Sequence, residues 1–102
     1  MNLGSAIKEL RKECGLTQIG LASKAKLSQT ALSQIEKGKR PGKNTLKKIS
    51  CALGVPESLI YIMGLEKEDV SPEKQSLYDT LFPVIKSMVE KLAISEEGLR
   101  DR

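Results

Sequence analysis

The sequence predicts an all-helical protein built around one small core, and three observations predict this class. Apolar residues recur every three or four positions along most of the chain, as they do on the buried face of a helix. Ser, Thr, Gly and Pro stand at the ends of these stretches, where helices are capped. A chain of 102 residues with 39% hydrophobic content suffices for one domain and an extension.

The periodic stretches of the first half predict five helices. Apolar residues mark three of these helices: Leu3, Ile7 and Leu10 the first, Leu21, Ala22 and Ala25 the second, and Leu46, Ile49 and Leu53 the fourth. Gly54 ends the fourth helix, and Pro56 precedes a short fifth helix that carries Leu59 and Ile60. With only three aromatic residues, the packing must rest on aliphatic side chains.

The third helix, predicted over residues 28–37, has two different faces. At about 100° per residue, one face collects Gln29, Thr30, Ser33, Gln34 and Lys37, and the other collects Ala31, Leu32 and Ile35. A polar face of this kind is also typical of an ordinary solvated helix. However, Thr17 and Ser28 stand as N-caps and Gly38 as a C-cap, which predicts two short helices joined by a turn. A Gln side chain can read adenine in the major groove of DNA.

In their order and spacing, these segments resemble the phage-repressor family of helix-turn-helix DNA-binding domains, also called Cro or XRE-type. The matching segments are IKELRKECGLTQ, LASKA, LSQTALSQIEKGKRP and TLKKISCALGV, and the resemblance covers roughly residues 3–63. It implies a five-helix lambda-repressor-like DNA-binding domain over residues 1–64. Residues 65–102 then form a linker and a C-terminal helical extension.

The resemblance also implies roles for individual residues. Four residues would read bases and five would contact the DNA backbone: Gln29, Thr30, Ser33 and Gln34 in the first group, and Gln18, Lys37, Lys39, Arg40 and Lys43 in the second. Arg11 on the first helix would pair with Glu36 at the end of the third helix, and this pair would be structural.

Two residues depart from the pattern of the family. Gly20 lies inside the second helix where Glu is usual, and an interior glycine costs about 1 kcal/mol relative to alanine. Lys26 lies at the turn where glycine is common, so a left-handed backbone there would strain it. Neither change removes a predicted base-reading residue.

Charge is distributed unevenly between the two parts of the chain. Residues 1–65 contain eleven Lys and Arg against four Asp and Glu, a net charge of +7, whereas residues 66–102 contain six against nine, a net charge of −3. The basic charge therefore lies on the part expected to bind double-stranded DNA, although a solvated basic surface would look alike.

The C-terminal segment predicts a further helix with a wide apolar stripe. Residues 65–70 form an acidic connector, and Ser71 and Pro72 open the helix. The predicted dimerisation residues are Leu77, Leu81, Ile85, Met88 and Leu92, and Val84, Tyr78, Phe82 and Val89 widen the stripe. The helix can fold back on its own domain or pair with a second copy. Pairing is favoured because a two-fold dimer reads a symmetric operator, and Pro83 predicts a kinked helix or a two-helix hairpin.

Several classes of function are disfavoured by what the sequence lacks. The chain has no histidine and two cysteines, Cys14 and Cys51, so we expect no metal site, no cofactor and two free thiols. It contains no phosphate-binding loop and no GxSxG motif, so we expect no enzyme. Its longest apolar stretch, around residues 59–63, is far shorter than the roughly 20 residues of a membrane helix, and we expect a cytoplasmic protein.

These expectations combine into a sequence-specific DNA-binding transcriptional regulator, by default a repressor, that forms a homodimer and reads half-sites about 34 Å apart. A controller of restriction and modification genes would act by the same mechanism. The alternative is an antitoxin-like or adaptor protein whose C-terminal helix captures a protein partner. An apolar patch that remains exposed on the dimer would favour this alternative.

Overall fold

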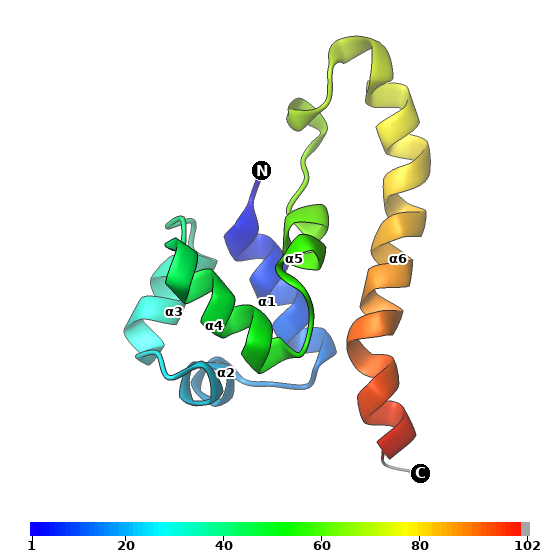
Figure 1. The fold of residues 1–102 in the computed structure, drawn as a ribbon. Coiled ribbons are helices and arrows are strands. Elements are labelled where there is room, and N and C mark those ends of the chain that lie inside the picture. The colour runs from blue at the N-terminus through cyan, green and yellow to red at the C-terminus, as the bar shows by residue number, and fades with distance from the viewer. Residues whose placement is uncertain (101–102) are drawn as a thin grey trace.

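The described backbone, residues 1–100 of a computed structural model, is helical and contains no strand, which confirms the predicted fold class. Side chains are described for residues 1–92. The elements are α1 (Leu3–Glu13), α2 (Gln18–Ala25), α3 (Gln29–Glu36), α4 (Lys43–Leu53), α5 (Glu57–Met63), the short 3₁₀ helices η1 (Lys67–Asp69) and η2 (Pro72–Lys74), and α6 (Gln75–Arg100). Helices α1 to α5 form a compact body, and α6 runs alongside it (Figure 1).

Side-chain caps begin the first three helices. The Oδ1 atom of Asn2 accepts a hydrogen bond from the Ser5 N–H at 2.9 Å and so caps α1. Thr17 Oγ1 accepts from the Gly20 N–H at 2.9 Å, and Ser28 Oγ accepts from the Ala31 N–H at 3.0 Å. The predicted caps of α2 and α3 are therefore confirmed. Each cap hydrogen-bonds one of the N–H groups that the first turn of a helix leaves unpaired.

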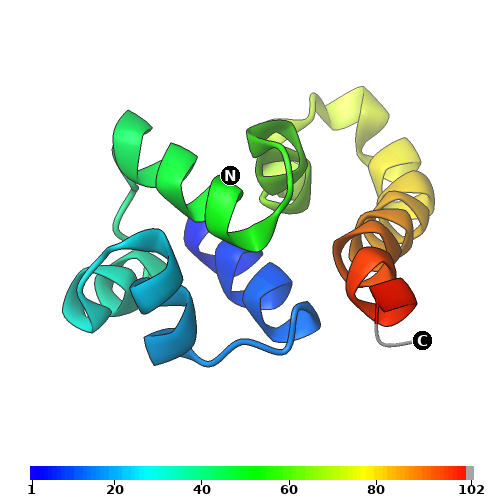
Figure 2. The same ribbon diagram turned by 60° about the horizontal axis from the view of Figure 1, so that its bottom comes forward.

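The core is aliphatic and draws on every helix of the body. Its most deeply buried large side chains are Ile7, Leu10, Leu21, Leu32, Ile49 and Ile60. Figures 1 and 2 show the same arrangement from two directions: α1 passes through the middle of the body, with the α2–α3 pair on one side and α5 on the other. The predicted apolar positions of the first, second and fourth helices all belong to this core.

A glycine lets α1 lie directly against the end of α3. A Cβ atom added to Gly4 would stand 2.0 Å from the carbonyl oxygen of Ile35, which is backbone and cannot swing aside. Any side chain at residue 4 would therefore push the two helices apart. This close contact fixes the position of α3 relative to α1.

Helix α6 is a single helix that continues through Pro83, so of the two predicted alternatives, a kinked helix and a two-helix hairpin, the hairpin is wrong. Proline removes one hydrogen bond of the helix, the one to the carbonyl of Asp79. Both Pro83 and Asp79 are exposed, so water can hydrogen-bond that carbonyl. A 3₁₀ turn from Pro72 to Lys74, with Ser71 before it, leads into the helix, close to the predicted start.

Part of α6 folds back on the body of its own chain. Val89 is only 4% exposed and joins the core, and α6 contacts α1 and α5. Tyr78 stacks on Phe82 with ring centroids 4.8 Å apart, and its hydroxyl donates to the Leu65 carbonyl at 2.9 Å. The sequence favoured pairing with a second copy over folding back, whereas this face of the helix folds back on its own chain.

A polar contact fastens the middle of α6 to α1. Lys86 Nζ lies 3.0 Å from Glu9 Oε1, with both side chains more than a third exposed. The hydrogen bond to this carboxylate raises the pKa of the Lys86 ammonium group. The pair therefore persists at neutral pH and is lost as the pH rises through the raised pKa of Lys86.

Candidate nucleic-acid interface

Helix α3 is divided into a buried face and an exposed one, as the sequence predicted. Leu32 and Ile35 are buried in the core. Three of the four predicted base-reading residues, Gln29, Thr30 and Gln34, are exposed, and Ser33 is half-buried. The helix thus packs through its apolar residues and presents hydrogen-bonding side chains that the core does not use.

A buried ion pair holds the end of α3 on α1. Arg11 Nε lies 2.8 Å from Glu36 Oε2, and Arg11 Nη2 donates to Glu36 Oε1 at 3.1 Å, so the contact is bidentate. The side chain of Glu36 is only 4% exposed. Arg11 Nη1 also donates to the Leu16 carbonyl at 2.9 Å, which ties the start of the helix-turn-helix unit to the same guanidinium. The predicted pairing of Arg11 with Glu36 is present in this geometry.

Two glutamines extend this network to the exposed surface. Gln18 Nε2 donates to Glu36 Oε1 at 3.2 Å, and Gln29 Nε2 lies 3.5 Å from Gln18 Oε1. A chain of polar contacts therefore runs from Arg11 through Glu36 and Gln18 to Gln29. Sequence reasoning assigned Gln18 to the DNA backbone and missed these contacts, because no local pattern shows that the first residues of α2 and α3 meet.

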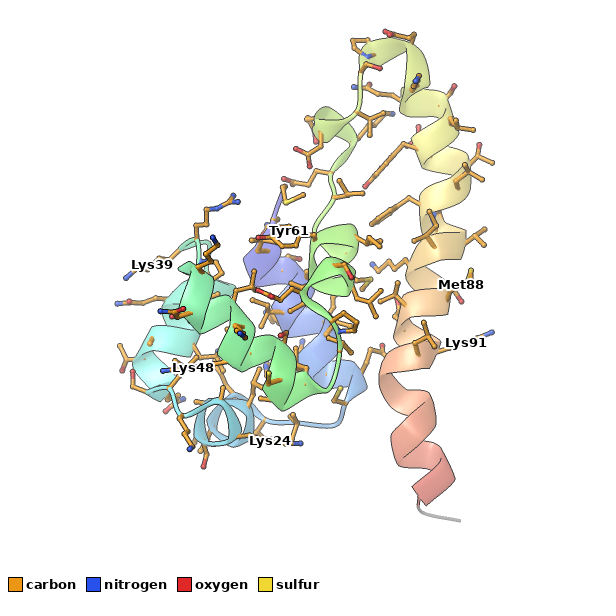
Figure 3. The ribbon with its side chains drawn as sticks, in the orientation of Figure 1. Lys24, Lys39, Lys48, Tyr61, Met88 and Lys91 are labelled. Carbon is orange, nitrogen blue, oxygen red and sulfur yellow. The ribbon has the colours of Figure 1, made fainter. Side chains whose placement is uncertain are left out.

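Exposed cations follow the C-terminal end of α3. The predicted backbone-contacting Lys37, Lys39, Arg40 and Lys43 are all exposed, on the C-cap of α3, on the loop after it and at the start of α4. Figure 3 shows Lys39 on the side of the molecule that carries α3, whereas Lys91 lies across the molecule on α6. Amide side chains and cations thus occupy the same region, as recognition of bases and phosphates requires.

The comparisons with known proteins decide the family. Residues 7–60 match the model of the Helix-turn-helix family, and this match covers more than half of the chain. The chain belongs to the helix-turn-helix family. It is also similar to the immunity repressor protein of Bacillus phage phi105, with 38% identity over 81 residues. The match covers 78% of this chain and 54% of that protein, so the chain spans about half the length of the curated relative it matches. No solved structure shows a significant match.

The described part of this helix-turn-helix protein contains neither a metal site nor a membrane-spanning helix. No group of three or more Cys, Asp or Glu side chains is arranged to hold a metal ion. Cys51 is exposed, and the half-buried Cys14 Sγ lies 3.9 Å from the Leu53 carbonyl oxygen. None of the described helices is both long and apolar enough to span a membrane.

A second group of cations was not predicted. Lys24, Lys26, Lys47 and Lys48 line a groove between α2 and α4. The spacing of four between Lys43 and Lys47 could have pointed to one helix face. Nothing in the sequence shows, however, that α2 and α4 lie side by side.

Proposed function

We propose that this protein is a sequence-specific DNA-binding transcriptional repressor that binds a double-stranded operator. The observation that carries the proposal is the exposed amide face of α3, with Gln29 in contact with Gln18 and so with the buried Arg11–Glu36 pair. A base-reading side chain needs a defined position before it meets DNA. The neighbouring Gln18 amide supplies a partner that can orient Gln29.

Affinity and specificity come from different residues in this proposal. Lys37, Lys39, Arg40 and Lys43 bind phosphates together with Gln18, and their contribution falls as salt rises. Gln29, Thr30, Ser33 and Gln34 read base edges, where a good bidentate contact discriminates by about 1–3 kcal/mol. Repression follows if the occupied operator overlaps a promoter, and the similarity to a phage immunity repressor supports this sign of regulation.

The proposal includes a homodimer joined through α6. The predicted dimerisation residues remain exposed although the helix has folded back: Leu77 53%, Leu81 46%, Ile85 39%, Met88 60% and Leu92 62%. At about 100° per residue they lie beside the face that Tyr78, Phe82 and Val89 present to the body. A stripe of this length on a stable protein indicates a further partner.

A second copy of the chain is the partner that this stripe fits best. The stripe is continuous with an apolar groove of about 220 Å³ between the connector and the first half of α6, lined by Leu65 and Val70 among others. Two-fold pairing lets each stripe cover the other, and it gives the two reading helices the symmetry of a palindromic operator. Half-sites one helical turn apart, about 34 Å, or a multiple of it, are the expected spacing.

Selection of bound fragments from a random DNA pool at near-physiological salt tests the main proposal. Recovery of one two-fold symmetric motif is the expected result. Binding without any recovered motif would contradict sequence-specific reading. It would favour the alternative function, an antitoxin-like or adaptor protein, in which the exposed stripe on α6 captures another protein.

The dimer is tested with Leu81→Lys combined with Met88→Lys. Both side chains are exposed, so the variant should fold but sediment as a monomer at concentrations where the wild type is dimeric. Thr80→Lys combined with Ser87→Lys is the matched control, because it adds the same charge on the polar side of α6. A wild-type protein that sediments as a monomer would refute the proposed dimer. The stripe would then be expected to bind a different protein.

A further inference from the structure

A groove lies between the end of α2 and the outer face of α4, away from the four predicted base-reading residues. It has a volume of about 540 Å³, and the small side chains of Ala25 and Ala52 line it. Four exposed lysines surround these alanines: Lys24, Lys26, Lys47 and Lys48. We call this feature the lysine groove.

The charge of the lysine groove is unbalanced. No acidic side chain belongs to its described lining, and none of its four lysines forms an ion pair among the described residues. Residues 18–53 carry eight Lys and Arg and a single acidic residue, Glu36, which Arg11 already neutralises. Four like charges around one groove repel one another, and an anionic occupant would relieve this repulsion.

One of the four lysines is held in an unfavourable backbone conformation. Lys26 ends α2 with φ 58° and ψ 44°, the left-handed region that favours glycine, and it has the only positive φ among the described non-glycine residues. A lysine there weakens the fold relative to glycine. Strain of this kind often marks a functional position, and the residue that carries the strain here is a cation beside the groove.

The groove is continuous with the proposed contact to DNA. Lys43 begins α4, and Lys47 follows it one turn later on the same face of the helix. Asn44, beside Lys43, already lines the groove. Figure 3 shows Lys24 and Lys48 on the part of the molecule formed by α2, α3 and α4, with Lys91 on the far side.

We propose that the lysine groove binds the sugar–phosphate backbone of DNA that flanks the half-site read by α3. The inference rests on the proposed function and extends it to a second set of phosphates. Lysine ammonium groups suit the phosphates, and Ala25 and Ala52 offer an apolar surface for the deoxyribose rings. Continuity with Lys43 favours DNA over an acidic protein segment as the occupant.

Binding to a 30-base-pair duplex of arbitrary sequence, titrated over a range of salt concentrations, tests the proposal. The slope of log affinity against log salt is negative, and Lys48→Gln should reduce its magnitude by about 0.9 for each bound copy. Lys91→Gln is the matched control, because it removes one lysine charge from α6, and its slope should equal that of the wild type. A Lys48→Gln slope equal to the control would overturn the proposal and point to an acidic protein as the occupant.

Lys26→Gly separates a structural role from a binding role. Relief of the left-handed strain should raise the melting temperature, while loss of the cation should reduce the magnitude of the salt slope. A variant that melts higher and binds DNA as the wild type does would overturn the role of Lys26 in the groove. If the wild-type protein binds no duplex at any salt concentration, the proposed function itself fails, and this inference fails with it.

Discussion

The two ends of the molecule are attached to the core in different ways. At one end, α3 is fastened by the buried pair of Arg11 and Glu36, by the close contact at Gly4, and by Leu32 and Ile35 in the core. At the other end, α6 has one deeply buried side chain among its described residues, Val89, and its ion pairs are exposed or half-exposed. Figures 1 and 2 place the two helices on opposite sides of the body.

This difference shows which part of the protein is complete within one chain. The charged side chains buried beneath α3, Arg11 and Glu36, satisfy each other's charges and hydrogen bonds, so this helix has a defined position within one chain. The described part of helix α6, residues 75–92, buries one side of its apolar arc and leaves the stripe from Leu77 to Leu92 exposed. Substitutions at the two ends of the molecule should therefore differ in their effects.

The largest effect should come from Glu36→Ala. The substitution leaves the guanidinium of Arg11, which is about one-tenth exposed, without its carboxylate, and loss of one partner from such a buried pair costs about 3–5 kcal/mol. Chemical denaturation measures the free energy of unfolding. Glu9→Ala is the matched control, since it removes the same side chain from the exposed pair with Lys86, where about 1 kcal/mol or less is expected. Similar losses for the two variants would contradict the contrast between the two ends.

Gly4→Ala should be the next most disruptive change. Alanine favours a helix by about 1 kcal/mol over glycine, but the new Cβ would stand 2.0 Å from the Ile35 carbonyl oxygen, and overpacking of this kind costs about 1–3 kcal/mol or more. We expect the cost of the clash to exceed the gain in helix propensity, so the free energy of unfolding should fall. Gly20→Ala is the control, because its nearest neighbour is the Thr17 hydroxyl at 3.1 Å, so a small change of either sign is expected. An unchanged Gly4→Ala protein would show that α1 can move away from α3.

Substitution of the reading face should alter specificity and leave stability unchanged. Gln29→Ala should weaken binding to the selected operator by about 1–3 kcal/mol and hardly affect a scrambled duplex, because Gln29 is expected to read a base. Arg40→Ala should weaken binding to both duplexes alike, since phosphate contacts carry no sequence information. Competition binding with the two duplexes distinguishes these patterns. Equal losses for both variants on both duplexes would refute the assigned roles.

The smallest effect is expected at the attachment of α6. Lys86→Gln removes an exposed ion pair and should cost about 1 kcal/mol or less. Because the folded state raises the pKa of Lys86, the stabilisation is present below the usual lysine pKa and is lost as the pH rises through the raised value. Thermal melts of wild type and variant should therefore converge in alkaline solution. A difference that persists at high pH would assign the effect to packing of the lysine stem.

Local patterns in the sequence predicted the helices, the caps at Thr17 and Ser28 and the two faces of α3, because each depends on residues a few positions apart. The pairing of Arg11 with Glu36 came from the resemblance to a family. Contacts between distant segments were out of reach, such as the approach of Gly4 to Ile35 and the burial of Val89. These contacts depend on how closely two helices cross, and the spacing of apolar residues along the sequence does not predict that distance. The continuation of α6 through Pro83 also depends on which side of the helix faces water.

The division of α3 into two faces bears on how such a protein can change during evolution. Leu32 and Ile35 maintain the fold, whereas Gln29, Thr30 and Gln34 make no contribution to the core. Substitutions at the exposed positions can therefore accumulate at little cost in stability. Under the proposed function, related proteins can thereby come to prefer different DNA sequences on the same scaffold. Glu36 lies on the same helix but lacks this freedom, since its carboxylate serves Arg11 and Gln18 at once.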